Sequence, residues 1–238
     1  MSRPLRFLFG VFSDSAKPIV KLMDDMDSDV AAALRSSIVR DKHAAVRSAS
    51  IVLLSGFLES FLRQCAEVFF EELERKGVRY AELPVSMHKV HFVGGLAEAQ
   101  KVVKGDDDDF SQTMAALGML ADPRTRNLPA LYWKAFAVTK GNPGPDVLAD
   151  YLKNFGVKNP LQAIGDMVEL DATFIRLNLQ SFISLRNECA HSGKTKKTPS
   201  TQDVREFVHF LRQLTLGISR VLEGTVKDLY RRAVENRS

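Results

Sequence analysis

Residues 43–77 have the sequence HAAVRSASIVLLSGFLESFLRQCAEVFFEELERKG. Apolar side chains recur at intervals of three and four residues through most of this stretch, which is the spacing of a buried helix. Because they occupy more than one face, we expect this helix to be the central one of the fold. Gly77 at its end is a typical helix stop. The stretch therefore predicts an all-α protein built around one long helix.

Helical patterns flank this stretch on both sides, and strand patterns are nearly absent. Residues 27–40 have helical spacing and begin with possible capping residues. Asp171 is placed to cap a helix that runs to His191, and residues 200–203 open another that runs to about residue 234. We expect core helices within residues 27–77 and 169–235 to form a bundle.

The middle third of the chain, residues 78–160, interrupts the long helices. Proline breaks helices, and six of the nine prolines fall here: Pro84, Pro123, Pro129, Pro143, Pro145 and Pro160. Shorter helices fit at residues 85–103, 110–120 and 146–155. We interpret this part as a helical insertion, a cap or specificity element, within one domain that covers residues 1–238.

The composition is that of an ordinary soluble protein, with 45% hydrophobic and 26% charged residues. A net charge of +4 is compatible with a polyanionic partner but does not require one. Cys65 and Cys189 lie far apart in helical patterns, which indicates a reducing compartment and not a disulfide framework. The apolar run at residues 7–12 is too short for a signal peptide, and no stretch reaches the roughly 18 apolar residues of a membrane span. We therefore expect a cytoplasmic protein.

The most specific local feature is LRNECAHSG at residues 185–193, at the end of a predicted helix. Asn187 and His191 are four residues apart and share a face. Arg186 is offset from Asn187 by about 100°, but its long side chain can bring the guanidinium toward that face. His191 ends the helix, where the helix dipole favours the protonated imidazole. The segment therefore groups a cation, an amide and a titratable imidazole.

These three groups are suited to cleaving RNA without a metal ion. The imidazole of His191 can take or give a proton near neutral pH. The guanidinium of Arg186 matches the geometry of a phosphate, and Asn187 can orient the imidazole or hydrogen-bond a phosphate oxygen. One group would deprotonate the ribose 2′-hydroxyl, the arginine would stabilise the developing charge, and a proton donor would release the 5′-oxygen.

The pattern Arg-Asn-x-x-x-His at a helix end, followed by a small polar residue and glycine, resembles the Rx4–6H motif of the HEPN superfamily. Residues 55–63 and 198–204 resemble the upstream helix and the downstream element of its RiboL-PSP-HEPN branch, and residues 141–157 are similar in style. The resemblance implies a helical bundle that forms a homodimer, in which two motifs build one composite endoribonuclease site. It also implies a toxin or host-defence role, with an antitoxin or regulatory protein as a possible partner.

The resemblance carries catalytic roles onto Arg186, Asn187 and His191, and onto Glu59 as an acidic residue of the upstream helix that lies near them. A two-fold arrangement makes chemical sense, because two symmetry-related histidines can share the roles of acid and base. A plainer interpretation of Glu59 is a surface carboxylate paired with Arg63 at i+4. Cys189, inside the motif, is better explained as a packing residue than as a nucleophile.

Other features leave alternatives open. The lysines that follow the motif could contact RNA phosphates or form an ordinary solvated loop; they are Lys194, Lys196 and Lys197. His88 and His91 have a metal-compatible spacing but no third ligand, so we expect no metal site and no cofactor. The alternative to a nuclease is a catalytically silent HEPN module that binds a partner protein or nucleic acid.

Overall fold

The computed structural model describes residues 4–102, 111, 132–137, 143–191 and 198–237. All regular elements within these ranges are helical. The predicted all-α fold is therefore confirmed.

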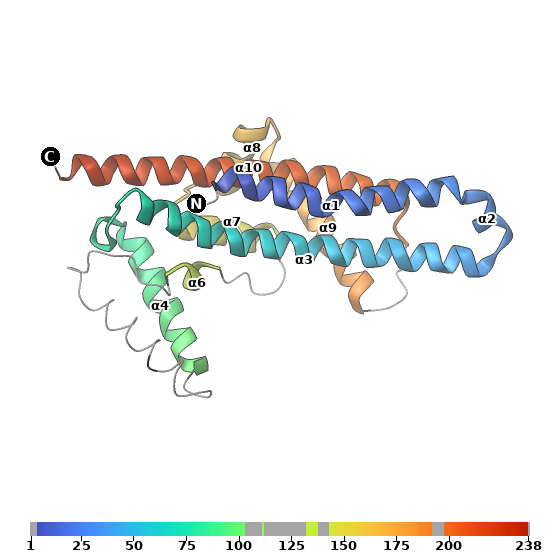
Figure 1. Ribbon diagram of the computed structural model, residues 1–238, viewed down its shortest axis with the longest axis horizontal. Helices are drawn as coiled ribbons and strands as arrows, with labels where there is room; N and C mark the ends of the chain where they lie inside the picture. The colour runs from blue at the N-terminus through green and yellow to red at the C-terminus, as the bar shows by residue number, and fades with distance from the viewer. Residues whose placement is uncertain (1–3, 103–110, 112–131, 138–142, 192–197, 238) are drawn as a thin grey trace.

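Three long helices form the main layer of the molecule. They are α1 (Leu5–Ser28), α3 (Ser37–Arg75) and α10 (Thr201–Glu235), and they lie side by side along the long axis (Figure 1). The short helix α2 (Val30–Arg35) joins α1 to α3 at one end of this layer. The helices pack because each carries a buried apolar stripe at helical spacing. In α1 the stripe consists of Leu5, Leu8, Phe12, Ala16, Ile19, Met23 and Met26.

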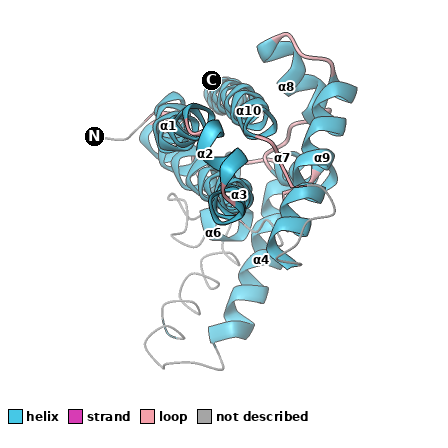
Figure 2. Cartoon of the chain, turned by 90° about the vertical axis from the view of Figure 1, so that its right-hand side faces the viewer, coloured by secondary structure: helices cyan, strands magenta, loops and turns pink. Residues whose placement is uncertain are grey.

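Three shorter helices cover another side of α3 and α10 (Figure 2). They are α7 (Pro145–Asn154), α8 (Pro160–Val168) and α9 (Ala172–His191). Helix α9 packs on α3, and α8 packs on α10. The second contact requires a glycine, since a Cβ atom added at Gly217 would lie 2.7 Å from Cγ2 of Ile164.

The predicted insertion is attached to the core by aromatic side chains. Its described elements are η1 (Tyr80–Glu82), α4 (Val85–Val102), α6 (Tyr132–Phe136) and α7. Phe136 of α6 is fully buried, and its ring centroid lies 4.9 Å from Phe70 of α3 and 5.2 Å from Phe155. The helices predicted at 85–103 and 146–155 correspond to α4 and α7. The one predicted at 110–120 falls mostly outside the described residues.

The helix predicted over residues 27–40 is wrong, because the chain breaks twice within it. Asp29 leaves the helical conformation after α1, and Ser36 is extended between α2 and α3. The hydroxyl of Ser36 accepts a hydrogen bond from Val39 N at 3.4 Å and so caps α3. The apolar spacing that suggests one helix is thus divided among three. The sequence patterns also do not predict α1, most of which precedes residue 27.

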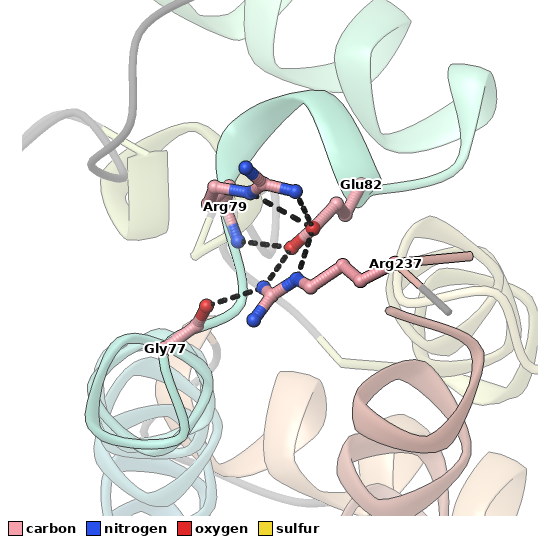
Figure 3. Close-up of polar contacts among 4 residues, drawn as sticks. All are labelled: Gly77, Arg79, Glu82 and Arg237. Carbon is pink, nitrogen blue, oxygen red and sulfur yellow. Dashed lines mark hydrogen bonds and ion pairs between the residues drawn. The ribbon is translucent and has the colours of Figure 1, made fainter. Parts of the chain in front are cut away.

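The far end of the bundle is closed by an arginine and carboxylate cluster (Figure 3). Gly77 ends α3 with φ of +70°, and Val78 N donates to Leu73 O at 3.0 Å, as in a Schellman stop. Arg237, just after α10, donates to Gly77 O at 2.7 Å and to Oε1 of Glu82 at 2.6 Å. The last helix is therefore tied to the turn between α3 and α4.

Among the described residues, α3 alone is long and apolar enough to cross a membrane by composition. It packs against α1, α9 and α10. The core helix of a soluble bundle passes the same compositional test, and nothing else in the described chain indicates a membrane.

Candidate active site

Asp171 sets the start of helix α9, which places Arg186 on the side that faces α3. Asp171 caps its first turn by accepting hydrogen bonds from Thr173 N at 2.8 Å and Phe174 N at 3.1 Å. These backbone hydrogen bonds lower the pKa of the Asp171 carboxyl. The predicted cap is therefore confirmed, and it fixes where the helix begins.

A fully buried stripe on α9 consists of Ile175, Leu179 and Phe182. Arg186 continues this stripe one turn later, so its side chain leaves the helix on the packed side. The side chain is half-buried, and its Nε atom is buried without a hydrogen-bond partner among the described residues. Its Nη1 donates to Oδ1 of Asn187 at 3.3 Å. The predicted reach of the guanidinium toward the Asn187 side is confirmed.

Cys189 lies one turn after Arg186 and contacts α3. It is half-buried, and burial raises the pKa of its thiol, an effect opposed by a hydrogen bond with Ser48. A raised thiol pKa keeps the group protonated at neutral pH, which disfavours a nucleophilic role. The packing interpretation of Cys189 is the one that the structure supports. The contact also sets the end of α9 beside Ser48.

Within one chain, Glu59 forms no hydrogen bond or ion pair with the described residues of the motif. Glu59 lies eleven residues after Ser48 on α3, which is about 16 Å along a helix. Its side chain is half-buried and forms no hydrogen bond or ion pair with any described residue, so the alternative pair with Arg63 is absent there too. The two positions do share one face of α3, since eleven residues span about three turns.

His191 is the last residue of α9, one turn after Asn187. Its side chain lies outside the part of the chain that the structure describes, and so do Lys194, Lys196 and Lys197. The helix itself places position 191 on the side opposite the buried stripe, because nine residues after Phe182 correspond to about 180°. Position 191 thus lies on the solvent side of α9.

Residues 199–201, at the start of α10, are anchored to α1 and α3. Pro199 is buried, and its carbonyl oxygen accepts a hydrogen bond from Nε of Arg47. Thr201 donates to Oδ1 of Asp27 at 2.7 Å. Ser200 and Asp203 form the capping box of α10. Both sides of the segment 192–197 are therefore fixed to α1 and α3.

The sequence patterns do not identify Arg47 and Ser48, which contact Pro199 and Cys189. They lie on α3 in a polar stretch before the apolar run, and each touches a segment about 140 or more residues away. No local motif marks such long-range contacts.

The described residues contain no group of three side chains that could hold a metal ion. His88 Nε2 lies 2.8 Å from Tyr80 O, and its ring stacks on Tyr80. His91 is fully buried, and burial followed by the nearby His88 lowers its pKa to about 4. It is therefore neutral at pH 7, which suits a packing role on α4.

A bundle of long helices with Arg-Asn-x-x-x-His at the end of one of them is the arrangement expected of a HEPN-type protein. The model of the RiboL-PSP-HEPN family matches residues 17–224. The chain belongs to this family. No curated protein and no solved structure gives a significant match. HEPN domains act in RNA cleavage or bind partners, and the family alone does not choose between these functions.

Proposed function

We propose that this chain is a metal-independent endoribonuclease that cleaves RNA by attack of the ribose 2′-hydroxyl, at a site completed by a second copy of the chain. Family membership supports this proposal. The observation that carries it is the contact between Arg186 and Asn187. A permanent cation and an amide are thereby held together one turn before position 191, where a general acid–base residue ends the helix.

The proposed roles follow from the chemistry of each group. His191 of one copy removes the proton of the 2′-hydroxyl, and His191 of the other copy protonates the leaving 5′-oxygen. Arg186 stabilises the negative charge on the phosphorus-bound oxygens. Asn187, held by Arg186, orients the phosphate or an imidazole. The lysines of the following segment would add phosphate contacts.

The solvent side of α9 supports the second copy. Leu177 is 63% exposed on this helix. Leu177, Ser184, Asn187 and position 191 follow at intervals of seven, three and four residues, so they share one face. A two-fold contact across this face would bury Leu177 and bring two motifs together.

The decisive test is RNA cleavage by purified wild type and variants in excess chelator. We expect His191→Ala and Arg186→Ala to lower the rate at least about 100-fold, and wild-type products to end in 2′,3′-cyclic phosphate. His209→Ala is the matched control, because His209 is an exposed histidine on α10. A folded, dimeric wild type that cleaves no RNA, or a His191→Ala variant as active as His209→Ala, contradicts the proposal.

The dimer has its own test. Leu177→Glu places a charge on the proposed contact face and should convert a dimer to a monomer, with a parallel fall in cleavage. Leu34→Glu is the control, because Leu34 is 80% exposed on α2, away from α9. Light scattering after size exclusion gives the mass of each variant. A Leu177→Glu protein that remains dimeric shows that the two copies meet elsewhere.

We further propose that the activity serves a toxin or defence role in the cytoplasm. Induced expression of wild type should then arrest growth, and expression of His191→Ala should not. An antitoxin or regulatory protein would bind the wild-type chain and relieve the arrest.

One observation favours the second candidate, a catalytically silent module that binds a partner protein. Helix α4 exposes large apolar side chains at helical spacing: Val85, Phe92, Val93 and Leu96. In that case Phe92→Asp should abolish capture of a partner, whereas His191→Ala should change neither growth nor RNA.

A further inference from the structure

A pocket of about 350 Å³ lies between the three long helices, near the residues where α1 begins and α3 ends (Figure 1). It is lined by the start of α1, the end of α3 and the second half of α10. Leu5 and Val226, both almost fully buried, are part of its apolar lining. The volume lies in the range of small-molecule sites, about 300–1,000 Å³. None of the described residues that line it belongs to α9, so the pocket is separate from the motif and from the proposed contact with a second copy.

The side chains that line the pocket carry more positive than negative charge. Four are cationic and two are carboxylates; they are Arg6, Arg75, Lys76 and Lys227, and Glu72 and Glu223. The excess of two positive charges matches a phosphate monoester, which carries about −1.5 to −2 at neutral pH. A carboxylate or an internal RNA phosphate has one negative charge and would leave one positive charge uncompensated. The charge of the pocket therefore favours a phosphate monoester.

Each carboxylate of the pocket binds one arginine and is itself shielded from water. Nε of Arg6 donates to Oε2 of Glu223 at 2.7 Å, and Nη2 of Arg75 donates to Oε2 of Glu72 at 2.6 Å. The two arginine side chains are 68% and 57% exposed, whereas the side chains of Glu223 and Glu72 are 17% and 12% exposed. A guanidinium has five N–H donors in one plane, so each arginine keeps further donors for a ligand. The carboxylates thus orient the arginines, and the cations are the charges that face solvent.

The two lysines of the pocket differ in how far they are already engaged. Nζ of Lys76 lies 4.9 Å from the centroid of the Tyr230 ring, a cation–π contact. Lys227 is exposed and forms no hydrogen bond or ion pair with any described residue. Lys227 is therefore the cation that a ligand can engage without breaking another contact, and its replacement should leave the fold intact.

We propose that this pocket binds a nucleoside monophosphate, with its phosphate held by Arg6, Arg75 and Lys227. An inorganic phosphate would leave much of the pocket to water, whereas an aromatic base fits beside the apolar lining, and guanidinium planes stack on aromatic rings. The inference goes beyond the proposed cleavage of RNA, since it adds a second ligand site at a distance from the motif.

The first experiment is isothermal titration calorimetry of the wild-type protein with each of the four ribonucleoside 5′-monophosphates, with inorganic phosphate and with adenosine. At least one nucleotide should bind about tenfold more tightly than inorganic phosphate, because its base buries apolar surface. Adenosine, which lacks the phosphate, should show no binding. Equal affinity for inorganic phosphate and every nucleotide would assign the pocket to the free anion and reject the nucleotide. Binding of none of the phosphates, or binding of adenosine as tightly as its monophosphate, overturns the inference.

The second experiment repeats the titration with the tightest nucleotide on variants of the pocket. Lys227→Gln and Arg6→Gln should each weaken binding about tenfold, because each removes a charge-assisted hydrogen bond to the phosphate. Lys21→Gln and Arg40→Gln are the matched controls, because both residues are exposed and neither lines the pocket. Both controls should bind as wild type does. Equal affinity of Lys227→Gln and Lys21→Gln overturns the inference, even if Arg6→Gln fails to fold.

A further variant separates this pocket from the proposed active site. Arg186→Ala should bind the nucleotide as tightly as wild type does, because Arg186 does not line the pocket. Binding that is lost in Arg186→Ala and unchanged in Lys227→Gln would place the nucleotide at the motif and reject the pocket. A mononucleotide has no internucleotide bond, so these titrations give the same answer whether or not the chain cleaves RNA.

Discussion

Arginine–carboxylate pairs hold both ends of the helical bundle together, but the carboxylates at the two ends differ in how far they are buried. At one end Glu82, whose side chain is only 8% exposed, accepts hydrogen bonds from Arg79 and Arg237. At the other, Arg205 of α10 pairs with Asp24 at 2.8 Å and Asp27 at 2.6 Å, carboxylates that are 61% and 45% exposed. Exposed ion pairs contribute little because water competes for both partners, whereas a shielded carboxylate depends on its partners.

The two ends also differ in what they hold: one end supports the stability of the fold, and the other supports the segment that follows the motif. The Glu82 end joins the last residues of the bundle to the turn after α3 and carries no part of the motif (Figure 3). The Asp27 end holds the segment that follows the motif, through Thr201 and through Arg47 on Pro199. We therefore expect substitutions at the first end to act on unfolding, and those at the second to act on RNA cleavage.

The largest expected effect on stability comes from Glu82→Gln. The substitution replaces the carboxylate that both arginines bind with a neutral amide. Because the amide has only one acceptor oxygen, Arg237 can no longer be bound through two oxygens. We expect the free energy of unfolding to fall by about 1–3 kcal/mol. Urea denaturation at pH 7 measures it. Glu74→Gln on the exposed side of α3 is the control and should stay within about 0.5 kcal/mol of wild type. Equal losses of unfolding free energy in Glu82→Gln and Glu74→Gln would contradict the special role given to the shielded Glu82 carboxylate.

The same carboxyl should make stability depend on pH. Hydrogen bonding to Arg237 is the main cause that lowers the pKa of Glu82 from 4.5 to about 2. The unfolded chain therefore binds a proton at this group before the folded one does, so the contribution is present above about pH 5 and is lost as pH falls toward 2. The gap in unfolding free energy between wild type and Glu82→Gln should shrink over this range. A gap that stays constant from pH 7 to pH 3 contradicts this assignment.

The sequence predicts the helices whose apolar spacing is uninterrupted and whose ends carry their own signals. Gly77 stops α3, Asp171 caps the start of α9 and Ser200 caps the start of α10, as expected. Helix α1 was missed although its apolar residues recur at intervals of three and four, because its start resembles a leader segment and Pro18 lies within it. The breaks at Asp29 and Ser36 depend on how α1 and α3 pack, which no local pattern reports.

In the candidate site too, a contact between sequence neighbours can be predicted, whereas the long-range contacts cannot. The contact between Arg186 and Asn187 joins neighbours in sequence, so the length of the arginine side chain suffices to predict it. The contacts of Ser48 with Cys189 and of Arg47 with Pro199 depend on the register of α9 and α10 against α3. The expected closeness of Glu59 to the motif depends on the same register, and Glu59 forms no hydrogen bond or ion pair with the described residues of the motif.

Arg47→Ala should affect RNA cleavage more than stability, if the proposed nuclease function holds. Its Nε atom donates to Pro199 O, and its partial burial lowers the guanidinium pKa. Loss of this anchor should lower cleavage about tenfold by displacing the segment after the motif, and the unfolding free energy by about 1 kcal/mol. Arg40→Ala, an exposed arginine of α3, should change neither. A large loss of stability with full activity would reverse the roles given to the two ends.

The smallest expected effect is that of Asp27→Asn. The hydrogen bond from Thr201 is the main cause that lowers the pKa of the Asp27 carboxyl, followed by Arg205. An asparagine can still accept the hydrogen bond from Thr201, and Arg205 retains Asp24, so we expect a loss below about 1 kcal/mol. Because the lowered pKa again favours the ionised folded state, any loss should be present at pH 7 and shrink as the pH falls below about 4. A loss equal to that of Glu82→Gln in the same urea measurement would show that exposure does not distinguish the two ends.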